Sequence, residues 1–102
     1  MIYRMVSYRV KPEALAEVGQ AIQEFIRAIK EAEPHAFYLA YRTPEETEFV
    51  HFMAFPDADA EAFHQKAPHT QRFVGVSYPN AERMPQFTDL SLLAATHQEE
   101  FK

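Results

Sequence analysis

Residues 36–55 of the chain have the sequence AFYLAYRTPEETEFVHFMAF. Two apolar, aromatic-rich segments, residues 36–42 and 48–55, flank a polar segment that contains Pro44. Aromatic and β-branched residues favour strands, and proline fixes the backbone conformation of a turn. The pattern therefore predicts a β-hairpin whose two strands pair in an antiparallel sheet.

The strands of this hairpin do not alternate between apolar and polar residues. In the second strand, Phe49 and Met53 would point to one face of the sheet, and Val50 and Phe52 to the other. An antiparallel sheet with helices on only one face normally carries polar side chains on its open face. Because both faces here favour burial, we expect a second copy of the chain to cover the open face, so that the protein is a homodimer.

Further elements are predicted on both sides of the hairpin. Apolar residues recur at steps of three and four from Leu15 to Ile29, which predicts an amphipathic helix that begins after Pro12 and ends at Pro34. Residues 2–10 and 87–95 are predicted as strands.

A second helical region is expected after the hairpin. A helix over residues 60–66 would be capped by Asp57 or Asp59, and another helical segment would start at Pro68. The order strand–helix–strand–strand–helix–strand is the ferredoxin-like arrangement of the α+β class, with one antiparallel sheet. We expect a single domain over residues 1–96 and a polar tail over residues 97–102.

The composition excludes several classes of site. The 102 residues include two glycines and no cysteine, and the net charge is −5. Without cysteine there is no disulfide framework, zinc–thiolate site or thiol nucleophile. Net negative charge without basic clusters argues against nucleic acid and anionic membranes as partners, and no apolar run is long enough to span a membrane. In the absence of a signal-peptide pattern we expect a cytoplasmic location.

Four segments resemble a known family in their order and spacing. They are YRVKPEALAEV (residues 8–18), EAEPHAFYLAYRTPEE (31–46), EFVHFMAFPDADAEAFHQ (48–65) and HQKAPHTQRFV (64–74). Together they resemble the antibiotic biosynthesis monooxygenase (ABM) type domain of the dimeric α+β barrel superfamily, over about residues 2–95. The resemblance implies a homodimer of two sheets packed face to face and a ligand pocket between sheet and helices.

The family includes cofactor-independent monooxygenases of quinols and polyphenols, haem-degrading oxygenases and members without known activity. Haem-degrading members have a tryptophan and a helical histidine that ligates iron, whereas this chain has no tryptophan and Val74 at the corresponding position. The resemblance therefore favours oxygenation of a small phenolic or quinol-like aromatic with O2 and no cofactor. Such a reaction needs a base, donors that hold the anion and a dry apolar pocket.

Candidate residues follow from these needs. Histidine titrates near neutral pH, so His51 or His64 is predicted as the catalytic base. Tyrosine and arginine can donate hydrogen bonds to a phenolate, and aromatic rings can form the wall of the pocket. The residues predicted to bind the ligand are Arg4, Tyr8, Phe25, Tyr38, Phe52 and Phe73.

Less specific interpretations remain open for the same residues. His51 and His64 could be packing residues, His69 could start and cap a helix, and His35 could replace a turn glycine. No HExxH or two-His-one-carboxylate spacing is visible, so no metal site is expected. The alternative function is a non-catalytic barrel that binds a small ligand or serves only for dimerisation. The sequence also leaves open which sheet face meets the helices.

Overall fold

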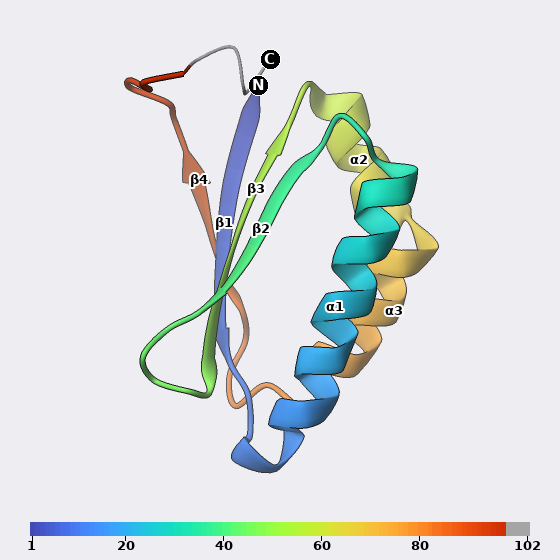
Figure 1. The fold of residues 1–102 in the computed structure, drawn as a ribbon, viewed down its shortest axis with the longest axis vertical. Coiled ribbons are helices and arrows are strands. Elements are labelled where there is room, and N and C mark those ends of the chain that lie inside the picture. Colours follow the sequence, from blue (N-terminus) through green and yellow to red (C-terminus); the bar gives the residue numbers. More distant parts are fainter. Residues whose placement is uncertain (98–102) are drawn as a thin grey trace.

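The computed structural model describes residues 1–97 (Figure 1). Its elements follow the predicted order and confirm the α+β, ferredoxin-like arrangement. They are β1 (Ile2–Arg9), a 3-10 turn η1 (Pro12–Ala14), α1 (Leu15–Ala32), β2 (Phe37–Arg42), β3 (Glu48–Phe55), α2 (Ala58–Lys66), α3 (Pro68–Ser77) and β4 (Gln86–Leu90).

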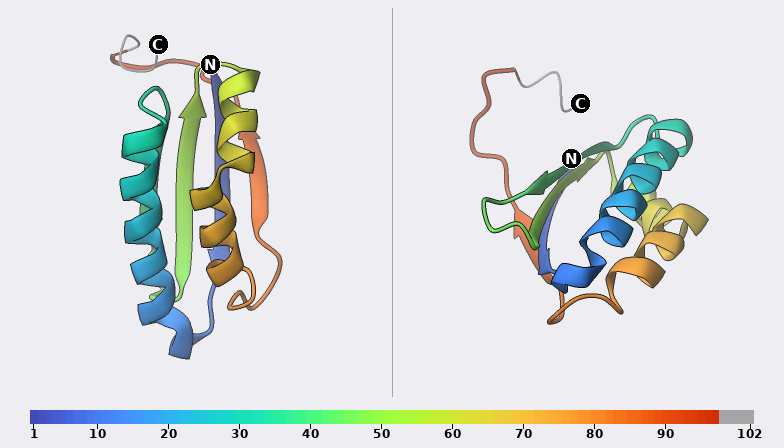
Figure 2. Two further views of the ribbon diagram at one scale, coloured as in Figure 1. Left: turned by 90° about the vertical axis from the view of Figure 1, so that its right-hand side faces the viewer. Right: turned by 60° about the horizontal axis from the view of Figure 1, so that its bottom comes forward.

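The four strands form one antiparallel sheet in the order β2-β3-β1-β4. The central strand β1 pairs with β3 from Ile2↔Phe55 to Arg9↔Glu48. All three helices lie on one face of this sheet, and within residues 1–97 the opposite face carries no helix (Figures 1 and 2). The fold is thus two layers, and the core lies between them.

Helix α1 packs along the sheet through the apolar stripe that the sequence predicts. Pro12 opens the preceding 3-10 turn, where its missing N–H costs nothing. The buried residues of α1 are Val18, Ile22, Phe25 and Ile29, which recur at steps of three and four. Their spacing fixes the face of α1 that packs against the sheet, where β2 is in contact with it.

Helices α2 and α3 are separate because Pro68 starts a new helix directly after Ala67. Asp57 caps α2: its carboxylate accepts a hydrogen bond from the Ala60 N–H at 2.9 Å. The cap residue of α3, Ala67, has no side chain that could do the same. The chain direction changes between the two helices, so that their inner faces line the same side of the sheet (Figure 2).

Strand β4 is shorter than the sequence predicts. It ends at Leu90 rather than residue 95. Leu90 pairs with Tyr3, and β1 begins only one residue before Tyr3, so residues beyond Leu90 have no neighbouring strand to pair with. Leu93 is consequently exposed. Among the described residues no helix combines the length and apolar character that crossing a membrane requires.

The structure settles which sheet face meets the helices. Alternate residues of the strands that face them are buried, including Tyr8 on β1 and His51 on β3. The open face carries the other set, among which Leu39 and Tyr41 are 36% and 55% exposed. Apolar side chains thus occupy both faces, as the sequence indicates.

Candidate functional site

A cavity of about 470 Å³ lies between the sheet and the helices α2 and α3. Its wall includes Phe25 and Phe73, whose rings stack at 4.5 Å and 3°, together with Tyr8, Tyr38 and His64. The volume falls within the range of small-molecule sites, and an apolar wall with a few polar groups is typical of them.

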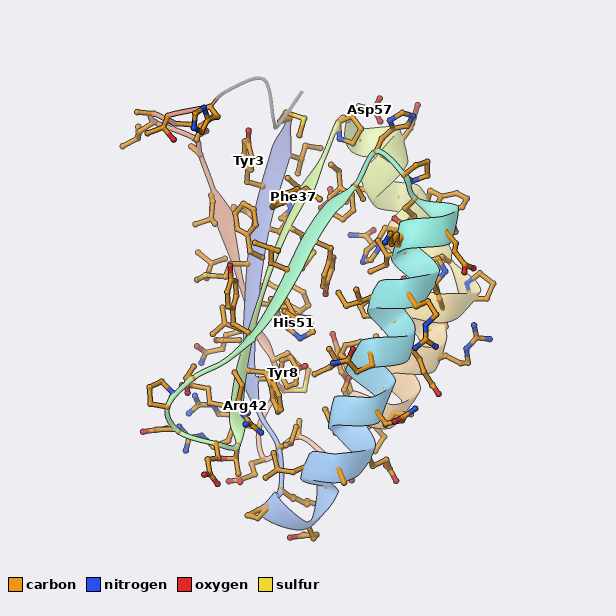
Figure 3. All side chains as sticks on the ribbon, in the orientation of Figure 1. Tyr3, Tyr8, Phe37, Arg42, His51 and Asp57 are labelled. Carbon is orange, nitrogen blue, oxygen red and sulfur yellow. The ribbon has the colours of Figure 1, made fainter. Side chains whose placement is uncertain are left out.

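His51 lies behind this wall and contacts two tyrosines. Its Nε2 is 2.8 Å from the Tyr8 hydroxyl and its Nδ1 is 2.7 Å from the Tyr38 hydroxyl. The His51 side chain has no exposed surface, and it lies with Tyr8 between the sheet and the helices (Figure 3). The two tyrosines line the cavity, whereas His51 does not.

Burial keeps this group of three uncharged. Desolvation lowers the pKa of His51 to about 4 and raises the pKa of both tyrosine hydroxyls above its ordinary value. A neutral imidazole has one donor and one acceptor nitrogen. One tyrosine therefore donates a hydrogen bond to His51, and the other accepts one from it. The accepting tyrosine still has its own hydroxyl proton, which can be donated to another acceptor.

A second polar group joins three helices. Glu33 Oε2 lies 2.9 Å from His64 Nδ1 and 2.6 Å from His69 Nε2. Glu33 follows the last residue of α1, His64 is on α2, and His69 is in the first turn of α3. All three side chains are buried. We refer to these residues as the Glu33 cluster.

The Glu33 cluster positions His64 for acid–base chemistry. A carboxylate only accepts hydrogen bonds, so the Nδ1–H of His64 donates a hydrogen bond to Glu33. The Nε2 of a neutral His64 is then unprotonated and can accept a proton. Because His64 also lines the cavity, it combines a fixed tautomer with access to a ligand.

The Glu33 cluster could also hold a metal ion. One ligand atom from each of Glu33, His64 and His69 lies within 4.8 Å of the others. Two histidines and one carboxylate suit zinc or non-haem iron. The residues are 31 and 36 positions apart, so the fold assembles a set that no local spacing reveals.

Arg4 lines the cavity but already has two carboxylate partners. Its Nε is 2.7 Å from Glu61 Oε2, and its Nη1 is 2.5 Å from Asp89 Oδ1. These bonds raise the pKa of Arg4 above its ordinary value and lower the pKa of Glu61. The guanidinium is therefore committed to this ion-pair network rather than free to bind an anion.

The structure brings most of the residues predicted from the sequence to one cavity. Those that line it are Arg4, Tyr8, Phe25, Tyr38, His64 and Phe73. His51 is separated from the cavity by its tyrosine partners. Phe52 does not reach the cavity, because strand alternation places it on the open face, where its ring lies 6.2 Å from that of Tyr3 and 6.3 Å from that of Phe37.

Glu33 was not among the residues predicted from the sequence, and His69 was expected only to start and cap a helix. One signal was available, because Glu33 stands at the carboxyl end of a helix, where the helix dipole disfavours a negative charge. A carboxylate in that position needs local hydrogen-bond donors, and the two histidines supply them. Glu61 and Thr70 also line the cavity and carried no signal in the sequence.

Comparison with known proteins finds one family model and several solved structures that are similar to this chain. A family model described as antibiotic biosynthesis monooxygenase matches residues 1–76. The fold is similar to a solved structure of an antibiotic biosynthesis monooxygenase, with 20% identity, a TM-score of 0.83, and coverage of 92% of this chain and 100% of that chain.

Two further structures are equally similar in fold. One from Bacteroides thetaiotaomicron shares 19% identity, with a TM-score of 0.85 and coverage of 94% of this chain and 92% of that chain. One from Nitrosomonas europaea shares 16% identity, with a TM-score of 0.82 and coverage of 92% and 100%. At these identities the similarity concerns the fold alone. A search of curated proteins gives no match.

Proposed function

The chain belongs to the antibiotic biosynthesis monooxygenase family, and from this premise we propose that it oxidises a small phenolic or quinol-like aromatic with O2 and without a cofactor. The observation that carries the proposal is the pairing of His64 with Glu33 at the wall of an aromatic cavity. This pairing supplies a base next to a space that suits an aromatic ring.

The first step in this proposal is removal of a proton from the ligand. A phenol must become a phenolate before it can reduce O2, and His64 Nε2 is the acceptor that the cavity offers. Glu33 then stabilises the imidazolium through the Nδ1–H bond of 2.9 Å. His51 does not take this role, because its low pKa and its two tyrosine partners keep it neutral.

The remaining steps need only the ligand, O2 and the proton that His64 has taken. The phenolate gives one electron to O2, and the two radicals combine to form a C–O bond and a peroxide anion. The His64 imidazolium returns its proton to this anion, and the hydroperoxide so formed loses water and leaves a quinone carbonyl. The ligand supplies four electrons, one oxygen atom enters the product, and the other leaves in water. The free hydroxyl of the Tyr8–His51–Tyr38 group can hold a ligand oxygen during these steps.

The aromatic wall supports the same proposal. The stacked Phe25 and Phe73 rings and the Tyr38 ring, which meets Phe25 edge-on at 75°, present flat apolar surface to a ligand. Aromatic rings favour such offset and edge-on contacts. An apolar enclosure also strengthens the electrostatic interactions of a phenolate with its donors.

We further propose that a second copy of the chain covers the open sheet face. Leu39 and Tyr41 are exposed on this face, and no helix within residues 1–97 covers them. The same face on two copies is self-complementary around a two-fold axis, and sheets pack about 10 Å apart face to face. The homodimer would bury this apolar surface.

Oxygen uptake tests the proposed reaction. Metal-free protein should consume O2 with at least one member of a panel of hydroquinones and polyphenols, and His64→Asn should lower the rate about 100-fold or more. His35→Asn is the control, because His35 is exposed and outside the cavity. Ligand binding without any uptake would instead support the alternative, a non-catalytic barrel that binds a small aromatic.

A further inference from the structure

Three charged side chains form one group at the wall of the cavity. They are Arg4 on β1, Glu61 on α2 and Asp89 on β4. Within residues 1–97, no other side chain that lines the cavity carries a charge when His64 is neutral. Arg4 and Asp89 pair across β1 and β4, so both side chains lie on the helix side of the sheet. The strands and α2 therefore fix the position of this group.

The group carries an excess of negative charge. Arg4 binds Glu61 through two hydrogen bonds, Nε to Oε2 at 2.7 Å and Nη2 to Oε1 at 3.2 Å. Its Nη1 is 2.5 Å from Asp89 Oδ1, and Arg4 is the only ion-pair partner of Asp89 within residues 1–97. One guanidinium thus serves two carboxylates, which leaves one negative charge unbalanced.

This charge acts on any ligand in the cavity. The side chain of Glu61 is 15% exposed and that of Asp89 is 82% exposed, so one carboxylate lies inside the wall and the other at the rim. Much of the remaining wall is aromatic or aliphatic and screens a charge less than water does. The unbalanced charge therefore repels an anionic ligand and attracts a cationic one.

The carboxylates lie near the proposed base. Glu61 is three residues before His64 on α2, so the two side chains project from the same face of the helix. A phenol whose hydroxyl reaches His64 can extend a short substituent toward the carboxylates. A positive charge on that substituent would offset their excess charge and would also favour the phenolate that His64 generates.

We propose that the ligand of this cavity is a phenol that carries a positively charged amine, and that Glu61 and Asp89 select it over anionic phenols. This inference rests on the proposed function, which supplies the phenol, and adds the charge of its substituent. The two carboxylates determine specificity by electrostatic attraction. Removal of the hydroxyl proton remains the role of His64.

Three phenols of similar size and different charge test this selection. At pH 7 tyramine is a cation, 4-ethylphenol is neutral and 4-hydroxyphenylacetate is an anion. Isothermal titration calorimetry at low salt should show that the wild type binds tyramine about tenfold more tightly than 4-hydroxyphenylacetate, with 4-ethylphenol between them. High salt should reduce this difference, because it screens the rim of the cavity.

Two variants change the charge of the group in steps. Asp89→Asn brings the sum of charges to zero and should remove most of the preference for tyramine. Glu61→Gln combined with Asp89→Asn leaves Arg4 without a carboxylate partner and should reverse the preference, so that 4-hydroxyphenylacetate binds more tightly than tyramine. Both proteins should bind 4-ethylphenol about as the wild type does, because that ligand has no charge.

Asp59→Asn is the matched control. It makes the same chemical change at an exposed position of α2 that does not line the cavity. This variant should keep the preference of the wild type for tyramine. Loss of the preference in Asp59→Asn as well as in Asp89→Asn would overturn the inference, because the net charge of the whole chain would then explain the selection.

The remaining outcomes separate this inference from the proposed function. Equal affinity of the wild type for the three phenols would overturn the inference and leave the proposed function standing, since oxidation requires only a phenol. An unchanged preference in Asp89→Asn would also overturn it, even if the double variant does not fold, because Asp89 is mostly exposed. If the wild type binds none of the three and consumes no O2 with any hydroquinone, the proposed function fails, and the inference fails with it.

Discussion

The Nδ1 atom of His64 lies 2.9 Å from the Oε2 atom of Glu33, and both side chains are buried. The same oxygen is 2.6 Å from His69 Nε2. One carboxylate oxygen therefore connects the end of α1 with α2 and the start of α3. This contact fixes both the relative position of the three helices and the tautomer of the base that faces the cavity.

Glu33→Gln should weaken the fold and the reaction together. An amide oxygen in the place of Oε2 can still accept from both histidines, but without the negative charge both bonds are weaker, and the amide NH2 then takes the place of Oε1, 3.1 Å from the Nδ1 donor of His64. We expect the free energy of unfolding in urea to fall by about 2 kcal/mol. We also expect kcat for phenol oxidation to fall about 10- to 100-fold, because the His64 ring is no longer oriented.

Glu31→Gln provides the control for this prediction. Glu31 is exposed on the same helix, and its replacement removes the same charge without any contact to the histidines. Its unfolding free energy and kcat should stay near the wild-type values. If Glu33→Gln behaves like Glu31→Gln, the carboxylate neither holds the helices together nor orients the base.

His51 should make the protein sensitive to acid. Its pKa is about 4 in the folded protein, against 6.5 for an unperturbed histidine, because burial disfavours the charged ring. Between these pH values the unfolded chain binds a proton and the folded protein does not. The free energy of unfolding therefore does not depend on the titration of His51 above pH 6.5. It falls as the pH drops from 6.5 to about 4, by about 3 kcal/mol in total from this residue.

The measurement is the free energy of unfolding at several pH values for the wild type and His51→Gln. Glutamine does not titrate and can still donate to one tyrosine and accept from the other. The other acidic groups and histidines are common to both proteins, so the difference in slope reports His51. Parallel slopes between pH 6.5 and 4 would contradict the low pKa of His51.

Added zinc should inhibit the proposed reaction through the Glu33 cluster. Zinc bound by Glu33, His64 and His69 would coordinate the carboxylate and the histidine nitrogens that now bond to each other. It would displace the protons of those nitrogens, so that Glu33 no longer orients His64. Zinc should therefore lower the rate of oxygen uptake, and EDTA should restore it. Competition with a coloured chelator should show tight binding to the wild type and much weaker binding to His69→Gln.

His35→Gln serves as the matched control for zinc, because His35 is exposed and outside the Glu33 cluster. It should bind zinc as the wild type does. Equal zinc affinity of His69→Gln and the wild type would place the metal elsewhere on the chain and would remove the explanation for inhibition.

The elements, and the sets of residues that share one face of the sheet, were predictable because they depend on local patterns, whereas the face that meets the helices was not. The limits of β3, Glu48–Phe55, follow from a largely apolar segment between Thr47 and Pro56. The separation of His51 from Phe52 follows from strand alternation alone. The end of β4 at Leu90 was not predictable, because it depends on where its partner β1 begins.

The candidate site was only partly predictable for a related reason. Sequence chemistry predicted His51 or His64 as a base and Tyr8 and Tyr38 as donors, but it could not show that the tyrosines separate His51 from the cavity. The contact of Glu33 with His64 joins residues 31 positions apart and exists only once the helices pack. Tertiary packing, not spacing along the chain, decides which polar groups meet.

The open sheet face gives the prediction that concerns assembly. Leu39 is 36% exposed on β2, on the face that we propose a second copy covers. Leu39→Glu would place a charge within that proposed apolar interface, where its desolvation is costly. We expect size-exclusion chromatography with light scattering to show a dimer for the wild type and a monomer for this variant.

Phe63→Glu is the control, since Phe63 is equally apolar, 56% exposed, and lies on α2 on the helix side. A wild-type mass close to 11.8 kDa would contradict the proposed dimer, and a dimer for Leu39→Glu would place the interface on another surface.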